Sequence, residues 1–442
     1  MSVAELRGAA PIMPIRFGAS ADSVVLSAYR DYQDALGASR ELVADKREIL
    51  RLYDVPGMTR AAAICHCSRS GSLLLASYFD GHPDTVTLPL LSGEQIYHCF
   101  KKHRGLSVWE KLIVYRTYSV LANPEEGDFP IGTADYYAAV HALYEAYGDR
   151  PTAWLNERQR YFQFLHVAYA VGTGRRPGSS RPMMIYAQHW VDQDLAECFI
   201  EDFPGAQFIH TIRDPISAID SWFDRQVEMD IAKSGHCPEA APRFLDAAAA
   251  SILNFLDWDH AHRGMEPRSR AVRFEDMHMM HEATMRRLAE WLHIAYSPCM
   301  LESTWNGRPY VVESGGVSWC GPNPANVRRR EKNFNRLDRA MMCALLHDNF
   351  NAWGYPNTQA PARRWQRAAL LALCFWVPMR MEIKNARLVW RLQVLPNLRR
   401  GRFSVAITAP LFLLKRRLRI MARIAAEAGV RLVGKRTVLE LL

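Results

Sequence analysis

Short apolar runs alternate with helical stretches through the middle of this 442-residue chain. The runs Ala61–Cys67, Met183–Ala187, Gln207–Ile212 and Ser269–Phe274 have the length and composition of strands that are buried on both faces. Strands that alternate with helices in this way form a parallel sheet with helices on both faces. The sequence therefore predicts an α/β fold with a doubly wound parallel sheet.

The stretches between these runs have the apolar spacing of helices. Helices are expected at Asp22–Tyr53, Gly71–Phe79, Glu94–Val120, Tyr136–Val171, Asp192–Asp202, from Ile216, and at His281–His293. The stretch Ser314–Pro324 is rich in Gly, Ser and Pro, which is typical of a loop.

The charge of the chain is distributed unevenly. Its net charge is +9, but residues 361–442 hold 18 Lys and Arg against 3 Asp and Glu, which gives +15 and leaves −6 for the rest. A shift of this size marks a boundary in composition. We therefore expect a helical lead-in over residues 1–60, the α/β domain over 61–360, and a basic amphipathic helical extension over 361–442.

Composition argues against a disordered, a disulfide-rich, a secreted or a membrane-spanning protein. Hydrophobic residues make up 49% and charged residues 23% of the chain, as in ordinary globular proteins. The nine cysteines show neither a paired framework nor zinc-like spacing, so reduced thiols in a cytoplasmic protein are expected. The first twenty residues lack the apolar segment of a secretory signal. Ala368–Met379 and Phe403–Leu414 have about half the length of a membrane span.

The first apolar run ends in the small and basic residues Ser68-Arg69-Ser70-Gly71-Ser72. A sharp turn from strand to helix directs backbone N–H groups toward one point, which binds a tetrahedral anion. The hydroxyl groups add donors, and Arg69 adds a positive charge. The G-x-x-x-x-G-K-[ST] pattern of ATP and GTP sites is absent. Taken alone, the segment also fits a serine-rich cap on an ordinary helix.

A second candidate segment follows the run Gln207–Ile212. Arg213 lies where this strand ends, Asp214-Pro215 turns the chain, and Ser221 lies two turns into the next helix. An arginine and a hydroxyl in this arrangement can hold one phosphate, because the guanidinium group offers two parallel donors. The alternative is an arginine at a strand end beside a surface serine.

The two segments together resemble the sulfotransferases that use 3′-phosphoadenosine 5′-phosphosulfate (PAPS). In that family, R-S-G-[ST] after the first strand holds the 5′-phosphosulfate, and R-[DN]-P with a helical serine eight residues after the arginine holds the 3′-phosphate. The resemblance runs from Ala61 to Tyr355. It includes His82-Pro83, Phe203-Pro204-Gly205-Ala206, Val272-Arg273-Phe274-Glu275-Asp276 and Trp353-Gly354-Tyr355.

The resemblance implies a sheet related to that of nucleotide kinases, PAPS as the sulfuryl donor, and no metal. Arg69 would neutralise charge on the leaving phosphate. One of the arginines of the run 328–330 would approach the 3′-phosphate, although this run also fits a solvated helix start. Leu73 departs from the family pattern, which often has a second hydroxyl there. The residues expected to bind PAPS are Arg69, Ser70, Gly71, Ser72, Leu73, Arg213, Ser221 and Arg329.

Two residues are candidates for the base that accepts the proton of the acceptor hydroxyl. His189 follows the strand Met183–Ala187 and resembles the histidine of the K-T-H segment of cytosolic sulfotransferases, with Ala187 in place of the lysine. An imidazole suits this task because its ordinary pKa is about 6.5. Glu94 resembles the catalytic glutamate of Golgi-type sulfotransferases. A structural hydrogen bond for His189 and a first-turn position for Glu94 are the alternatives.

The basic extension combines arginines with large apolar residues. Arg380, Lys384, Arg387 and Arg391 recur at spacings of three and four, and Trp376 and Trp390 lie nearby. Such a helix is expected to lie on an anionic membrane surface, with a partner protein or nucleic acid as less favoured alternatives.

The sequence thus predicts a PAPS-dependent sulfotransferase that acts on a hydroxyl acceptor, either a saccharide or a lipid-linked glycan at the cytoplasmic face of a membrane. Two alternatives remain open at this point. One is a nucleotide-dependent kinase of related fold, against which the missing Walker pattern argues. The other is a non-catalytic, membrane-docked nucleotide-binding protein. His210, Cys65 and Cys67 are expected to pack in the core.

Overall fold

The computed structural model of the protein forms two compact units, each described here by itself. The first unit comprises residues 1–65, 72–209 and 280–322, and the second comprises residues 66–71, 210–279 and 323–442. The structure describes residues 23–37, 40–66, 70–88, 92–118, 131–148, 150, 153–188, 193–221, 223–224, 266–314, 317–327, 332–355, 363–404, 407–408, 411–412, 414–415, 417–419, 421–422 and 441–442. The boundary expected near residue 361 stays a prediction.

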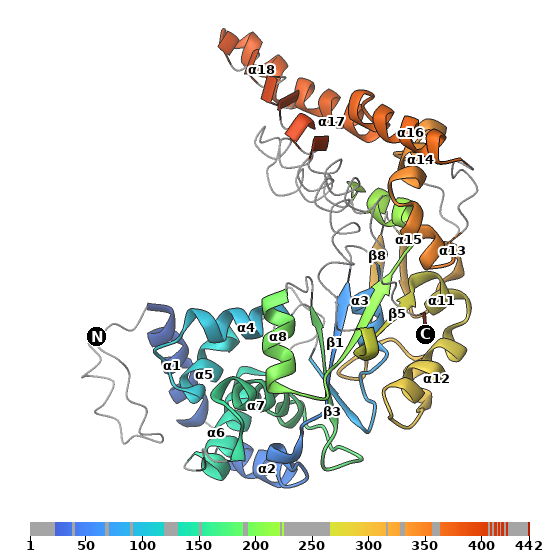
Figure 1. Ribbon diagram of the computed structural model, residues 1–442. Helices are drawn as coiled ribbons and strands as arrows, with labels where there is room; N and C mark the ends of the chain where they lie inside the picture. Colours follow the sequence, from blue (N-terminus) through green and yellow to red (C-terminus); the bar gives the residue numbers. More distant parts are fainter. Residues whose placement is uncertain are drawn as a thin grey trace. The chain divides into compact units, whose positions relative to one another are not determined.

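A five-stranded sheet is the centre of the fold (Figure 1). Its strands are β1 (Ala61–His66), β2 (Thr85–Thr87), β3 (Met183–Gln188), β4 (Gln207–Ile212) and β5 (Ser269–Arg273). They lie in the order β2-β3-β1-β4-β5. Strand β3 pairs in parallel with both β1 and β2. Helices flank the sheet, so the α/β fold expected from the sequence is confirmed.

The central strands are apolar because both of their faces are buried. In β1, residues 61–65 have no exposed surface, and residues 183–187 of β3 are at most 2% exposed. This burial includes Cys65, as expected, and raises the pKa of its thiol. His210 of β4 is also fully buried. Cys67 lies outside the described residues. The seven cysteines that the structure describes are all free thiols.

Helices of the first unit pack against one another and on strands β2 and β3. Helices α3 and α4 pack on β3, and α7 packs on β2 and on α6. Their bounds are α1 (Ser23–Gly37), α2 (Arg40–Leu50), α3 (Ser72–Ser77), α4 (Ser92–Lys102), α5 (Val108–Tyr118), α6 (Thr133–Tyr147), α7 (Glu157–Gly172), α8 (Gln193–Asp202) and α12 (His281–Trp291).

Three of the expected long helices are each divided in two. The prediction of one helix over 22–53 is wrong, because α1 ends at Gly37. The prediction over 94–120 is wrong because α4 ends before Gly105 and α5 begins at Val108. The prediction over 136–171 is wrong because Asn156 caps a new helix: its side chain accepts the N–H of Gln159 at 2.7 Å.

Two short hairpins follow α12. β6 (Thr304–Trp305) pairs with β7 (Arg308–Pro309), and β8 (Val311–Ser314) pairs with β9 (Val317–Cys320), both antiparallel. The Asn306-Gly307 turn has positive φ at both residues, +51° and +71°, as a two-residue hairpin requires. The expectation of a loop over 314–324 is wrong, because β9 lies within this range. Gly321 and the prolines after it mark the end of this strand, and they do not prevent it from forming.

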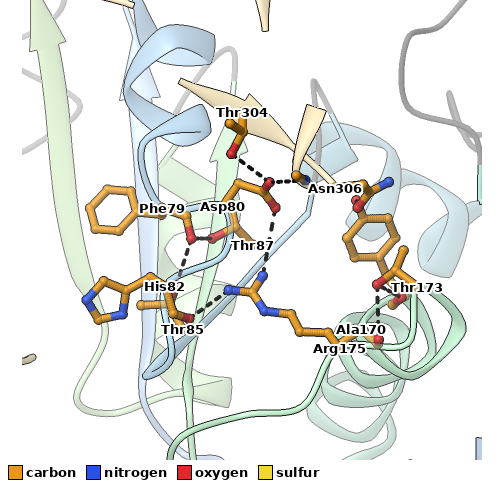
Figure 2. A network of polar contacts seen from close by, with 12 residues as sticks. Phe79, Asp80, His82, Thr85, Thr87, Ala170, Thr173, Arg175, Thr304 and Asn306 are labelled. Carbon is orange, nitrogen blue, oxygen red and sulfur yellow. Dashed lines mark hydrogen bonds and ion pairs between the residues drawn. The ribbon is translucent and has the colours of Figure 1, made fainter. Parts of the chain in front are cut away.

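A buried polar network joins the first hairpin to the turn after α3, as Figure 2 shows. The Asp80 carboxylate accepts hydrogen bonds from the Thr304 hydroxyl at 2.9 Å and the Gly307 N–H at 3.0 Å. The Arg175 guanidinium lies 4.0 Å from the other Asp80 oxygen and donates to the His82 carbonyl at 2.7 Å. Asp80 is 4% exposed, so these partners compensate its lost hydration. The network thereby fixes the C-terminal end of α3.

The second unit contains β5, the helix directly after it, and the helices from residue 324 onward. These are α11 (Phe274–Met279), α13 (Pro324–Val327), α14 (Arg336–Leu345), α15 (His347–Ala352), α16 (Arg364–Trp376), α17 (Arg380–Val389), a π-helix at Trp390–Val394 and α18 (Leu395–Arg399). At the chain end, the Leu442 N–H donates to the Ala271 carbonyl of β5 at 3.0 Å. No helix within the described residues is long and apolar enough to cross a membrane.

Candidate functional site

The order of the strands places the two candidate loops at the same edge of the sheet. Strands β1 and β4 are neighbours in the sheet. The chain leaves β1 toward β2 and β3 on one side, whereas it leaves β4 toward β5 on the other. In open α/β sheets, ligands bind beyond the carboxyl ends of the strands at such a switch point. The segments after β1 and β4 therefore lie where this kind of sheet is expected to bind a ligand.

Ser70 links the two loops directly. Its side chain is 1% exposed, and its Oγ lies 2.8 Å from Oγ1 of Thr211, a hydrogen-bond distance. Thr211 lies two residues before Arg213. Because buried hydroxyl groups need partners, this contact fixes the end of the first loop beside the start of the second.

Gly71 occupies a position that has no room for a side chain. Its φ is +87°, in the region that favours glycine. A Cβ built there would lie 2.7 Å from Cδ2 of Phe274 and 3.1 Å from Cε of Met277. Phe274 begins α11 and is 7% exposed. Its ring therefore fills the space beside the glycine and holds the backbone of the loop in place.

The same ring supports Arg213. The Arg213 guanidinium carbon lies 4.3 Å from the centre of the Phe274 ring, within the range of a cation–π contact. Phe274 thus contacts both segments that were predicted to bind phosphate groups. Stacking on the ring fixes the plane of the guanidinium group.

The turn after Arg213 is held by Glu275. Its carboxylate accepts the Asp214 N–H at 3.1 Å and the Tyr355 hydroxyl at 2.6 Å. Burial raises the pKa of the Glu275 carboxyl, and these two hydrogen bonds lower it in part. Beside it, Arg273 forms two hydrogen bonds with Asp276, at 2.6 and 2.9 Å. The segment 273–276 is therefore a support for the second loop.

The helix after the turn carries the candidate serine. The Asp214 side chain accepts the Ser217 N–H at 2.8 Å and so caps a helix over residues 215–221. Ser221 is half-buried on its last described turn. Asp220 accepts the Asn333 N–H at 2.8 Å and the Lys332 N–H at 3.3 Å. Burial raises the pKa of the Asp220 carboxyl, and these hydrogen bonds oppose the shift.

A model described as "Sulfotransferase family" matches residues 63–298, which is more than half of the chain. The chain belongs to the sulfotransferase family. A search of curated proteins found no match. Among solved structures, the sulfotransferase domain of the Synechococcus PCC 7002 olefin synthase is similar at 17% identity and a TM-score of 0.35, covering 70% of this chain and 92% of that one.

Two further structures are similar to this sulfotransferase. The sulfotransferase domain from the curacin biosynthetic pathway has 17% identity and a TM-score of 0.34, covering 71% of this chain and 96% of that one. A sulfotransferase of Mycobacterium avium has 13% identity and a TM-score of 0.31, covering 78% of this chain and 83% of that one.

The remaining predicted site residues divide into those the structure describes and those it does not. Ser72 begins α3 and is buried, and Leu73 is half-buried. Glu94 lies in the first turn of α4, where the alternative placed it, and its side chain is not described. Arg69, His189 and Arg329 lie outside the described residues. In the part of the chain that the structure describes, no three His, Cys, Asp or Glu residues are grouped so that they could hold a metal ion.

Sequence reasoning did not assign a role to Phe274, Glu275 or Thr211. The first two lie in the R-F-E-D segment, which the sequence marks only as part of the family resemblance. That segment was the available signal. Its function could not be derived without the structure, because the contacts join residues that are about 60 and 200 positions apart.

Replacing Gly71 with alanine tests whether Phe274 holds the loop. We expect Gly71→Ala to lower the free energy of unfolding by more than Gly81→Ala. Both glycines have positive φ, which costs about 1–3 kcal/mol for alanine, but a Cβ at Gly81 has no atom within 4 Å. The additional loss of unfolding free energy in Gly71→Ala therefore measures the steric clash between the new Cβ and Phe274. Urea unfolding monitored by circular dichroism detects this difference. Equal losses in the two variants would show that the ring does not restrict the loop.

Proposed function

We propose that this sulfotransferase transfers a sulfuryl group from PAPS to a hydroxyl acceptor. The observation that supports the proposal best is the contact of the single Phe274 ring with both Gly71 and Arg213. PAPS carries a 5′-phosphosulfate and a 3′-phosphate on one nucleoside. A protein that holds it must fix two anion sites relative to each other, and a shared ring provides such a link.

In this proposal each loop binds one end of the donor. The backbone of Ser70 and Gly71, with the Ser72 hydroxyl and Arg69, would bind the 5′-phosphosulfate. Arg213 and Ser221 would bind the 3′-phosphate, and Arg329 would add charge there. The stacking of Arg213 on Phe274 limits its side-chain freedom before the ligand arrives, which lowers the entropic cost of binding.

The transfer itself requires a bond exchange at sulfur. The acceptor oxygen forms a bond to sulfur while the bond from sulfur to the bridging phosphate oxygen breaks, and adenosine 3′,5′-bisphosphate leaves. The acceptor proton passes to the base, His189 or Glu94. Charge develops on the bridging oxygen, where Arg69 would stabilise it. As in phosphoryl transfer, positioning and electrostatics contribute most of the rate enhancement.

The acceptor is proposed to be a saccharide or a lipid-linked glycan at the cytoplasmic face of a membrane. Support for this part comes from the basic and apolar extension, which would bring the enzyme close to a lipid-bound acceptor. Membership of the family does not specify the acceptor. Incubation of the enzyme with PAPS and a panel of saccharides and glycolipids is the direct way to identify the acceptor.

Donor binding is tested by calorimetry with adenosine 3′,5′-bisphosphate. We expect Arg213→Ala to weaken binding at least tenfold, because a hydrogen bond to a charged group is worth about 1.5–3 kcal/mol. Arg213→Lys should recover only part, because lysine lacks the planar pair of donors. The exposed Arg287 on α12 offers a matched control, Arg287→Ala, with unchanged affinity. Unchanged affinity in Arg213→Ala, or equally tight binding of ATP, would contradict the proposal.

The base is identified by comparing His189→Asn with Glu94→Gln. Loss of the base should lower kcat by about 10²–10⁴ without changing the affinity for adenosine 3′,5′-bisphosphate. If His189 is the base, kcat/KM of the wild type should rise with pH as an imidazole loses its proton, since only the neutral form accepts one. Radiolabel transfer from PAPS measures both. If neither variant lowers kcat, neither residue is the base.

A further inference from the structure

The C-terminal extension presents an apolar face to solvent. On α16, the exposed residues lie at positions i, i+3, i+4, i+7, i+8 and i+11, which form one stripe along a helix. They are Trp365, Ala368, Ala369, Ala372, Leu373 and Trp376. The two tryptophans at its ends are 64% and 74% exposed. In a globular protein such a stripe normally faces the core, so its exposure requires a physical reason.

Cations alternate with apolar residues on the exposed face of α17 and at the first residue of the π-helix that continues it. Arg380, Ile383, Arg387 and Trp390 follow at spacings of three, four and three, and all four are exposed. Lys384 departs from the predicted basic face. It is half-buried and donates to the Asn333 side chain at 2.5 Å. The exposed face without Lys384 therefore combines the guanidinium groups of two arginines with the apolar side chains of Ile383 and Trp390.

The same composition continues beyond α18. Large apolar residues are exposed there at helical spacing, between the exposed cations Arg402, Lys415 and Arg419. They are Phe403, Ile407, Leu411, Leu414 and Leu418, with exposed fractions of 65%, 63%, 58%, 53% and 39%. Most of the large apolar residues exposed among the described residues thus belong to the extension.

No acidic side chain is exposed among the described residues between 363 and 422. Between residues 363 and 422 the sequence has one acidic residue, Glu382. It is 7% exposed and accepts hydrogen bonds from Arg417 at 2.8 Å and from the Met379 N–H at 2.7 Å. This carboxylate is turned inward, so every charged side chain exposed among the described residues between 363 and 422 is positive.

The extension is attached to the rest of the second unit by specific hydrogen bonds. The Arg380 N–H donates to Asp338 at 3.1 Å, and Arg367 donates to the Ala344 carbonyl at 2.9 Å. Lys384 reaches Asn333, whose N–H is bound by Asp220, the residue before Ser221. A ligand that binds the extension therefore also anchors the unit that holds Arg213.

We propose that the exposed residues of α16 and α17, with those described between 402 and 419, form a docking surface for an anionic lipid bilayer. Tryptophan favours the level of the lipid headgroups, and arginines beside it neutralise acidic headgroups. The helices lie in the plane of the interface, since no described helix is long enough to cross. A second copy of the chain is a poorer occupant, because it would bring together two surfaces of like charge.

Flotation of the full-length protein with lipid vesicles tests this surface. We expect binding to phosphatidylcholine vesicles that contain about 30% phosphatidylglycerol, weaker binding to pure phosphatidylcholine, and partial release by about 0.5 M salt, which screens surface charge. Equal binding to both vesicles, or none to either, would overturn the proposal. A dimer seen by analytical ultracentrifugation without vesicles would also overturn the proposal if Trp365→Ser with Trp376→Ser dissociated it. The face would then be a contact between two copies of the chain.

Charge variants define the role of the arginines. The triple variant Arg380→Gln, Arg387→Gln, Arg391→Gln should lower the vesicle partition coefficient by roughly a hundredfold, because each basic residue near an anionic surface contributes a factor of about five. A matched triple variant removes the same charge elsewhere, at exposed arginines of the first unit, and should bind vesicles like the wild type. It is Arg104→Gln, Arg176→Gln, Arg308→Gln. Equal losses in both variants would mean that net charge alone attracts the vesicle.

Apolar variants test insertion into the interface. Trp365→Ser with Trp376→Ser should lower the partition coefficient at least tenfold, whereas Leu155→Ser, at a site that is 68% exposed outside the extension, should not. Unchanged partitioning of the tryptophan variant would contradict docking through this face. Affinity for adenosine 3′,5′-bisphosphate should stay the same in all these variants, so this proposal and that of donor binding fail independently.

Discussion

The ring of Phe274 lies where a side chain at position 71 would have to be, and its face carries the Arg213 guanidinium 4.3 Å from its centre. Two segments that are separated by about 140 residues are thereby fixed relative to one aromatic group. The Ser70–Thr211 hydrogen bond adds a second link at 2.8 Å. Because protein interiors are close-packed, a change at any of these positions displaces the others. The arrangement of both candidate anion-binding loops depends on this contact.

The surrounding residues stabilise the ring and the loops from outside. The Glu275 carboxylate accepts hydrogen bonds from the Asp214 N–H and from the Tyr355 hydroxyl. It thereby links the turn after β4 to the segment Trp353-Gly354-Tyr355. Asp220 ties the following helix to Asn333, which also receives Lys384 of the extension. A chain of direct contacts therefore connects the proposed lipid-binding helices with the helix of Ser221. Such polar links are expensive to break when they are buried, which favours one conformation over many.

The sequence was sufficient for those features that local physical chemistry determines. Strands β3 and β4 lie where the apolar runs predicted them, because burial on both faces requires continuous apolar residues. Residues Gly71 and Arg213 were selected from motifs, and the structure joins them. The role of Phe274 could not be predicted, because it depends on which strand neighbours which. The inward position of Lys384 likewise depends on a tertiary contact that periodicity does not encode. The helix break near Gly105 has a local cause, because the side chains of Ser107 and Glu110 each accept the other residue's N–H and so begin a new helix.

One ring, that of Phe274, contacts both candidate anion-binding loops and so sets the distance between them. A crystal structure with bound adenosine 3′,5′-bisphosphate tests it most directly. We expect the 5′-phosphate at the backbone N–H groups of Ser70 and Gly71 and the 3′-phosphate at Arg213 and Ser221, with the Phe274 ring in contact with both loops. A nucleotide bound elsewhere, or one whose phosphates occupy these loops while Phe274 has moved away from Gly71, would contradict it.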